Sequence, residues 1–185
     1  MTRRAIAFWG ILFAANVFAA PAQVIIIRHA EKPPSGNELD ARGWQRAQAL
    51  VGFFETNTSV TRYGTPAAIY AMNPKKPGGS VRAIQTVTPL AEDLGLEIQH
   101  PYTKHELGKV VDAILTNHDY DRRMVLVCWE HGVIPDLVKA FGWDRAPDTW
   151  EDPIYDRAWI LNFSGDKVVS FEDIPQHLLP GDSAN

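Results

Sequence analysis

The sequence predicts an α/β fold, a three-layer sandwich in which helices flank a central, mostly parallel sheet. Two runs are apolar throughout, at 24–27 (VIII) and 124–129 (MVLVCW). A strand buried on both faces of a sheet has this pattern, because neither side of it meets water. Segments with the periodicity of amphipathic helices follow both runs. Alternation of buried strands with such helices is typical of parallel sheets covered on both faces.

After the first strand, the first half of the chain is expected to form a helix, a short strand and a second helix. Asp40 is a suitable N-cap for the first helix. The apolar residues of that helix fall on one face, and they are Trp44, Ala47, Leu50, Val51 and Phe54. Residues 67–71 predict the short strand. The Pro- and Gly-rich segment 72–79 predicts a loop, and residues 81–94 predict a helix that ends at Gly95.

The second half continues the alternation and ends in a hairpin. A short strand is expected at 97–100. The spacing of Thr103 and Glu106 is that of a capping box, which would open a helix through Leu115. The remaining elements are the strand at 124–129, a helix at 134–141 closed by Gly142, and a hairpin of 158–163 with 167–171 across a Ser-Gly-Asp turn.

The N-terminal residues differ from the rest of the chain and predict a signal peptide. Two arginines form a basic start, residues 5–18 form an apolar run, and small residues offer cleavage sites near Ala19 or Ala22. An uncleaved membrane anchor is the alternative, but the run is short for a bilayer span. We expect residues 1–22 to be removed and residues 23–185 to form a single periplasmic or secreted domain, without stable membrane association after cleavage.

The composition restricts the partners and cofactors of the chain. Its 185 residues suffice for one domain, and a formal net charge of −4 provides no general basic field for nucleic acid. Cys128 is the single cysteine, which excludes an intramolecular disulfide and a thiolate metal cluster, and its apolar setting predicts a buried strand position. Four histidines lack the mutual spacing of a metal site, namely His100, His105, His118 and His177. We therefore expect no metal and no cofactor.

Basic side chains follow the two buried strands at the point where each strand ends. The first strand runs into Arg28-His29, and the strand at 124–129 runs into Glu130-His131-Gly132. In open α/β sheets, ligand sites lie beyond the carboxyl ends of the strands, so both histidines are expected at one crevice. Arg82 stands in the first turn of a predicted helix, whose N-terminus also favours an anion.

Two arginines and two histidines at one place suit the transfer of a phosphoryl group. Two guanidinium groups can hold phosphoryl oxygens by paired, charge-assisted hydrogen bonds. One imidazole can attack phosphorus, while the other donates to the oxygens whose charge increases in the transition state. The arginines then supply the positive charge that a metal would otherwise provide. A single Arg-His pair would be weak evidence, whereas the joint placement of four groups indicates a site.

Four segments resemble, in order, the motifs of the histidine phosphatase superfamily, phosphoglycerate mutase-like branch. Residues 27–33 (IRHAEKP) resemble its Arg-His signature, and residues 39–47 (LDARGWQRA) are similar to its Leu-Thr/Ser-x-x-Gly-x-x-Gln-Ala stretch. Residues 82–86 (RAIQT) resemble its Arg-x-x-Gln-Thr segment, and residues 130–132 (EHG) its second catalytic histidine. The ordered set covers roughly residues 24–140, and order makes it far more specific than one motif.

The resemblance implies a central mixed sheet flanked by helices and a role for each basic residue. His29 would be the nucleophile and become transiently phosphorylated. Arg28 and Arg82 would clamp the phosphate, and His131 would stabilise the transferring group. The chain would then be an exported phosphomonoesterase whose partner is a phosphorylated small molecule, or phosphate itself.

The general acid that protonates the leaving oxygen is left open by the sequence, because the common Leu-x-Glu pattern of the family is missing. Glu130 lies beside the second histidine and could donate a proton if its pKa were raised. Glu106 lies in about the right region, although its place in the capping box is a structural explanation. Glu31 and Asp136 are further carboxyl candidates.

Three lysines are candidates for binding the substrate beyond its phosphate. Lys75 and Lys76 lie in the loop before the helix that carries Arg82, and Lys32 follows the Arg-His signature. Each of the three could equally be a solvated surface residue. Two other functions stay open: a phosphate-binding protein that has lost turnover, and a phosphomutase, which export disfavours.

Overall fold

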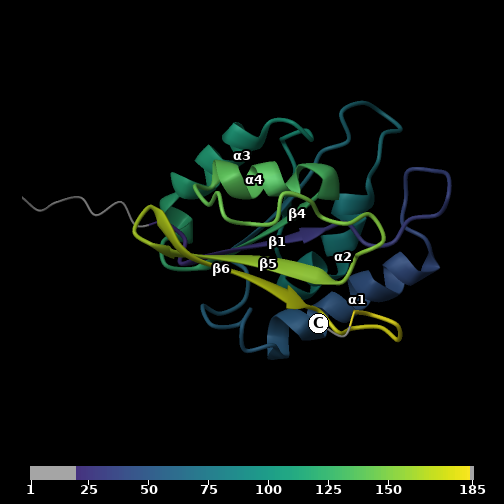
Figure 1. Ribbon diagram of the computed structural model, residues 1–185. Coiled ribbons are helices and arrows are strands. Elements are labelled where there is room, and N and C mark those ends of the chain that lie inside the picture. The colour runs from purple at the N-terminus through teal and green to yellow at the C-terminus, as the bar shows by residue number, and fades with distance from the viewer. Residues whose placement is uncertain (1–19, 184–185) are drawn as a thin grey trace, which may run out of the picture.

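The structure is a computed structural model that describes residues 20–183, so most of the predicted signal peptide lies outside it (Figure 1). In chain order, the elements are β1 (Gln23–Arg28), α1 (Ala41–Thr56), β2 (Ala68–Ala71), α2 (Arg82–Leu94), β3 (Ile98–Gln99), α3 (Leu107–Leu115), β4 (Met124–Trp129), α4 (Ile134–Ala140), β5 (Arg157–Ser164) and β6 (Lys167–Pro175). None of the helices in this part of the chain combines the length and the hydropathy needed to cross a bilayer.

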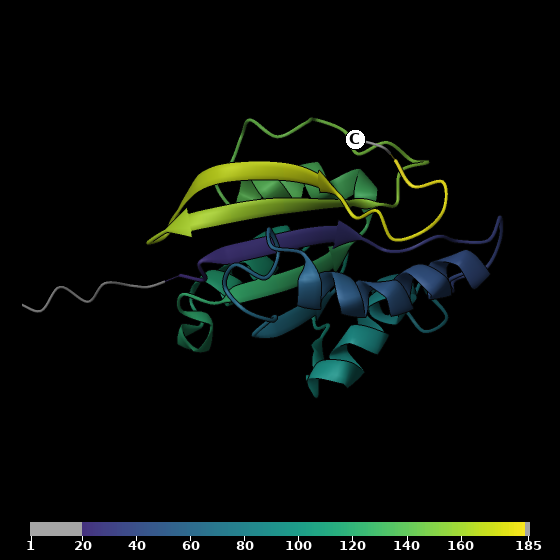
Figure 2. The same ribbon diagram turned by 90° about the horizontal axis from the view of Figure 1, so that it is seen from below.

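The six strands form one mixed sheet in the order β3-β2-β4-β1-β5-β6. The first four are parallel, whereas β5 joins β1 antiparallel and β6 joins β5 antiparallel. Helices α1 and α2 pack together on one face of the sheet, and α3 and α4 pack together on the other (Figure 1). Figure 2 shows the hairpin at the edge of the sheet, with β6 outermost. The predicted three-layer α/β sandwich with a mostly parallel sheet is confirmed.

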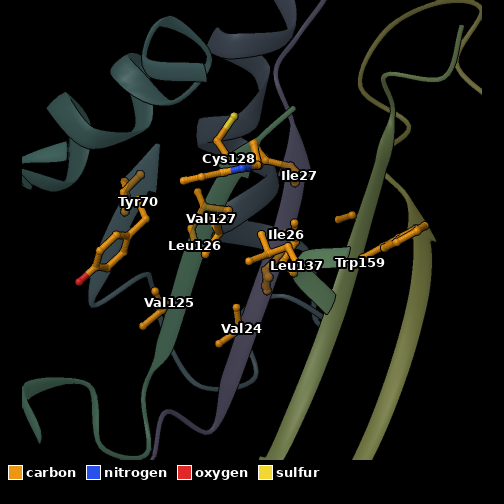
Figure 3. Close-up of a cluster of buried hydrophobic side chains, with 14 of the residues drawn as sticks. Val24, Ile26, Ile27, Tyr70, Val125, Leu126, Val127, Cys128, Leu137 and Trp159 are labelled. Atoms are coloured by element: carbon orange, nitrogen blue, oxygen red, sulfur yellow. The ribbon is translucent and has the colours of Figure 1, made fainter. Parts of the chain in front are cut away.

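The two apolar runs form the centre of the sheet, as their pattern predicts. Every residue of β1 and of β4 is buried. Ile26 of β1 and Leu126 of β4 have no exposed surface, and Leu137 of α4 lies in the same cluster (Figure 3). Cys128 is buried without a disulfide, and burial raises the pKa of its thiol, so the thiol stays protonated at neutral pH.

Helix α1 begins where its cap predicts, but its predicted buried face is wrong at Trp44. The side chain of Asp40 accepts a hydrogen bond from the backbone N–H of Gly43 at 2.8 Å. Trp44 is 37% exposed, while Arg46 and Phe53 are buried. The buried stripe is rotated because Arg46 has carboxylate partners inside the molecule, which local periodicity cannot reveal.

Candidate active site

The site is built at the carboxyl ends of β1 and β4, which are neighbours in the sheet. Arg28 pairs with Trp129 in the ladder, and the N–H of His29 donates to the carbonyl of Trp129 at 3.0 Å. Glu130 and His131 follow directly after that carbonyl. The two strands therefore release the Arg28-His29 and Glu130-His131 pairs side by side, as expected from the parallel topology.

Arg28 is a buried guanidinium with one edge held by backbone carbonyls, while the nearest acceptor to its other edge is the exposed Asp152 carboxylate, 3.6 Å from Nη2. Its Nη1 donates to the carbonyl oxygens of Asp152 at 2.6 Å and Ile154 at 2.7 Å. The ring of Tyr155 lies against it, 3.8 Å from Cζ to the ring centroid. Nε and Nη2 are buried, and neither donates a hydrogen bond to the described residues. Two nitrogens of this geometry can bind two oxygens of a tetrahedral anion in a bidentate manner.

His29 is held as a neutral imidazole with one nitrogen available for attack. Its side chain is buried, and Nδ1 lies 2.8 Å from the carbonyl oxygen of Ala30, an acceptor that requires the proton to be on Nδ1. The lone pair is then on Nε2. Burial lowers the pKa of His29 to about 4, and the positive charges of Arg28 and Arg82 act in the same direction. At neutral pH the ring is therefore uncharged, with the lone pair of Nε2 unprotonated.

Helix α2 brings Arg82 close enough to influence His29 and is fastened to the same loop. The hydroxyl of Thr86 accepts the N–H of Ala30 at 2.8 Å, which ties α2 to the residue after the nucleophile. Arg82 is half-buried and donates through Nε to the carbonyl of Glu38 at 3.1 Å and through Nη2 to the carbonyl of Gly36. Arg82 thus orders the loop before α1 while adding positive charge beside His29.

His131 lies between two carboxylates. Its Nδ1 is 3.2 Å from Oε1 of Glu130, and its Nε2 is 3.3 Å from Oδ1 of Asp152. Burial and the charge of Arg28 lower the pKa of His131, whereas the two carboxylates oppose this change. Nδ1 makes no hydrogen bond to the described residues, whereas a hydrogen on Nε2 would point toward Oδ1 of Asp152, beside Arg28.

Glu130 is paired with a lysine on the side away from His131. Nζ of Lys104 lies 2.7 Å from its Oε2. Burial favours the neutral acid, but the hydrogen bond and charge of Lys104 outweigh it and lower the pKa of Glu130. Glu130 is therefore ionised at neutral pH, and an ionised carboxylate is not suited to proton donation.

Glu106 is occupied at the start of α3. Its carboxylate accepts hydrogen bonds from the N–H and hydroxyl of Thr103 at 2.9 and 2.8 Å, and it pairs with Lys109 at 2.7 Å. These contacts, the one to Lys109 foremost, lower the pKa of Glu106 to about 2. The predicted capping box would start the helix directly after Thr103, but α3 begins at Leu107 with Glu106 as its N-cap residue, so the predicted start is wrong by about one turn. This arrangement is structural and keeps the carboxylate ionised.

The segment before β5 supplies two site residues that the sequence analysis did not identify, Asp152 and Tyr155. Because β5 is antiparallel to β1, it begins at the edge where β1 ends, with Ala158 opposite Ile27. Tyr155 packs on Arg28, and its ring centroid is 6.2 Å from that of His29. The rule that sites lie at the carboxyl ends of parallel strands could not identify this segment, because it precedes an antiparallel strand. The predicted hairpin at 158–171 could have indicated this segment, but only if the sequence had shown that its first strand runs antiparallel to β1.

A buried ion-pair network supports the loop that follows His29. Arg46 of α1 binds Glu31 and Asp182, each with a shortest distance of 2.7 Å. A Cβ added at Gly43 would lie 2.3 Å from the carbonyl oxygen of Glu31, so this close approach of α1 requires glycine. Glu31 is therefore engaged in positioning the loop, and the C-terminal segment is fastened to α1 (Figure 1).

The candidate lysines lie at two places. Lys32 is exposed, and its charge contributes to lowering the pKa of His131. Lys75 and Lys76 line a cavity of about 620 Å³ together with Lys104 and His105. Because Lys104 also pairs with Glu130, this basic cavity lies beside the catalytic edge of the sheet.

Residues 20–183 contain no group of three or more His, Cys, Asp and Glu side chains placed to hold a metal ion. The positive charge around His29 comes from Arg28 and Arg82. The chemistry that the described side chains offer is the binding of a tetrahedral anion beside a neutral imidazole.

Comparison with known proteins rests on structure, since no protein-family model and no curated protein sequence matches the chain. The protein histidine phosphatase SixA, solved with tungstate, superposes with a TM-score of 0.58 at 16% identity, over 83% of this chain and 97% of that one. An alpha-ribazole phosphatase from Shigella flexneri superposes with a TM-score of 0.50 at 14% identity, over 78% and 92% of the two chains. The chain thus has the fold of phosphatases of the histidine phosphatase superfamily, the phosphoglycerate mutase-like α/β sandwich.

Proposed function

We propose that the chain is an exported phosphomonoesterase that acts through a phosphohistidine on His29 without a metal ion. One observation carries the proposal: a neutral imidazole and the buried Nε–Nη2 edge of Arg28, which makes no hydrogen bond and has only the exposed Asp152 carboxylate at 3.6 Å, share one position against Tyr155. A buried guanidinium edge without an acceptor is costly unless an anion completes it. An anion with several oxygens, held beside a nucleophilic nitrogen, matches a phosphate monoester.

The reaction follows from the positions of these groups. Nε2 of His29 attacks phosphorus, the P–N bond forms, and the bond from phosphorus to the ester oxygen breaks. Arg28 and Arg82 hold the non-bridging oxygens, and His131 donates to the oxygen whose charge increases. Water then attacks the phosphohistidine, which releases phosphate and regenerates neutral His29.

The basic cavity favours a substrate with a second anionic group. Lys75, Lys76, Lys104 and His105 line it, and none of the residues that line it is acidic. The structural neighbours are named as a protein histidine phosphatase and an alpha-ribazole phosphatase. A cavity of about 620 Å³ is of the size that small ligands fill. We therefore assign a small phosphorylated molecule, with a second phosphate or a carboxylate in this cavity.

Covalent catalysis is tested by trapping the intermediate. Wild-type protein should hydrolyse phosphomonoesters and, when denatured in base during turnover, carry a phosphoryl group on His29, because phosphoramidates are stable to base and labile to acid. His29→Ala should abolish both signals. His118→Ala is the matched control, because His118 precedes β4 at the opposite edge of the sheet. Full activity of His29→Ala would exclude this mechanism.

The same assays separate the two alternative functions. Wild-type protein that binds orthophosphate but turns over neither activated nor unactivated esters would be a phosphate-binding protein. Transfer of labelled phosphate to an added hydroxyl acceptor, in preference to water, would indicate a phosphomutase.

Metal independence is tested by chelation. Because Arg28 and Arg82 supply the charge that faces the phosphate, turnover should survive prolonged treatment with EDTA. A complete loss of turnover that zinc or magnesium restores would contradict this part of the proposal.

Export is supported by the pattern of residues 1–22, and the fold favours cleavage after Ala19. The carbonyl of Ala20 accepts the N–H of Arg122 at 3.1 Å, and the N–H of Ala22 donates to the carbonyl of Arg123 at 2.9 Å. Cleavage after Ala22 would remove both contacts. N-terminal sequencing of the exported protein should therefore begin at Ala20, and an intact Met1 on a membrane-bound chain would refute export.

A further inference from the structure

Asp152 has a backbone held by Arg28 and an exposed carboxylate that faces both Arg28 and His131. Its carbonyl accepts Nη1 of Arg28 at 2.6 Å, and Pro153 restricts the backbone that follows. Its side chain is 71% exposed, yet Oδ1 lies 3.3 Å from Nε2 of His131 and 3.6 Å from Nη2 of Arg28. The carboxylate can thus change its orientation at the mouth of the site while the chain that carries it stays in place.

The other carboxylates near the site are committed elsewhere. Glu130 is bound by Lys104, Glu106 by Thr103 and Lys109, and Glu31 by Arg46. Asp152 differs from them because its nearest charged neighbours, His131 and Arg28, are the groups that receive the phosphoryl oxygens in the proposed reaction.

A bound phosphoryl group would make the surroundings of the Asp152 carboxylate more negative. The phosphoryl oxygens take over the donors of Arg28 and His131, so the Asp152 carboxylate loses both of these partners. At the same time it gains an anionic neighbour in the same crevice. The Asp152 carboxyl group then faces the bound phosphoryl group and the oxygen that leaves from it. A protonated carboxyl at the mouth of the site can donate to the departing oxygen.

We infer that Asp152 is the general acid of the proposed phosphatase reaction. In the first step, Nε2 of His29 forms the bond to phosphorus, the ester P–O bond breaks, and the Asp152 proton moves to the leaving oxygen, which departs as an alcohol. In the second step, the Asp152 carboxylate takes a proton from water as that water attacks the phosphohistidine. Phosphate leaves, and His29 and protonated Asp152 are restored.

The inference rests on the proposed function and is tested by the dependence of rate on the leaving group. Asp152→Asn keeps the size of the side chain but cannot transfer a proton. It should lower kcat/KM for an alkyl phosphate such as glycerol phosphate by about 10²-fold or more, because that alkoxide needs a proton as it departs. For 4-nitrophenyl phosphate, whose leaving group needs no proton, the loss should stay below about fivefold. The ratio kcat/KM reports the first chemical step even where hydrolysis of the intermediate limits kcat.

Asp148→Asn is the matched control, since Asp148 lies in the same segment, is 87% exposed and pairs with Lys139. It should leave both substrates unchanged, and thermal melting should show both variants folded. Equal losses on the two substrates for Asp152→Asn would overturn the inference. So would a gain on both with tighter orthophosphate binding, because Asp152 would then be only a competing anion. Wild-type protein that hydrolyses neither ester would instead overturn the proposed function.

Discussion

Replacing Arg46 by methionine tests whether the buried ion-pair network holds the catalytic loop and the C-terminal segment together. Arg46 has 3% of its side chain exposed, and it binds both Glu31 and Asp182. Methionine keeps much of the volume but removes the cation. The two carboxylates, with 11% and 4% of their side chains exposed, are then left facing each other without their main partner.

The expected cost lies at the lower end of the range for breaking a buried pair, which is about 3–5 kcal/mol. Arg42 still reaches Glu31 and Asp182, each at 3.1 Å. The Asp182 carboxylate also accepts the backbone N–H groups of Leu178 and Leu179, at 2.9 and 3.0 Å. These remaining contacts bring our value for Arg46→Met to about 3 kcal/mol, or about 6–12 °C in Tm for a domain of this size.

Urea unfolding at pH 7 measures this difference in the free energy of unfolding, and Arg42→Met is the control. Arg42 makes parallel contacts from a side chain that is 41% exposed, so its loss should cost less than about 1 kcal/mol. Equal costs for the two variants, or an Arg46→Met protein as stable as wild type, would refute the reasoning about burial.

The advantage of wild type over Arg46→Met should also depend on pH. Burial alone would raise the pKa of Asp182, but the hydrogen bond from Arg46 and those from the backbone lower it from 3.8 to about 2. A carboxyl whose pKa is lowered on folding stabilises the protein above its unfolded pKa. The advantage should therefore be constant from pH 7 to about 4 and shrink as pH falls toward 2.

Three further predictions concern catalysis. Arg82→Ala should lower kcat/KM by about 10²-fold or more, about 3 kcal/mol. Arg82→Lys should restore kcat/KM only in part, because an ammonium group cannot make the paired hydrogen bonds of a guanidinium group. Full recovery would mean that charge alone matters. Changing Lys75 and Lys76 together to alanine should raise KM for a doubly anionic substrate, with kcat for a small aryl phosphate nearly unchanged and a weaker salt dependence than wild type; identical kinetics would make this loop a surface turn. Burial lowers the pKa of His29 to about 4, so kcat/KM, corrected for substrate ionisation, should fall on the acid side only as pH drops through about 4. A fall of kcat/KM that begins near pH 6.5 would mean that the imidazole is solvated.

The strands and the basic pairs that follow them are examples of what local patterns can predict. The runs that form β1 and β4 contain no polar residue except at their ends, and only a fully buried strand tolerates this. Because parallel strands end at one edge, the position of Arg28-His29 relative to Glu130-His131 followed from the same patterns. The N-cap at Asp40 and the stop at Gly95, which has φ 64°, are equally local signals.

The partners of charged residues were decided by the tertiary structure. Glu130 beside a phosphate site suggested a proton donor, but Lys104, 26 positions earlier in the chain, keeps it ionised. Arg46 looked like a polar position on α1, and its burial depends on Asp182, which is more than a hundred residues away.

The sequence by itself determined the layers of this protein, the edge of the sheet that carries the site, and four basic residues at that edge, because each depends on short-range periodicity and on where strands end. The tertiary structure alone decided which carboxylate faces the reacting groups. Asp152 reaches His131 only because β5 returns antiparallel beside β1. The pKa and the role of an ionisable group depend on neighbours a few ångströms away in space, and residues distant in the chain supply them.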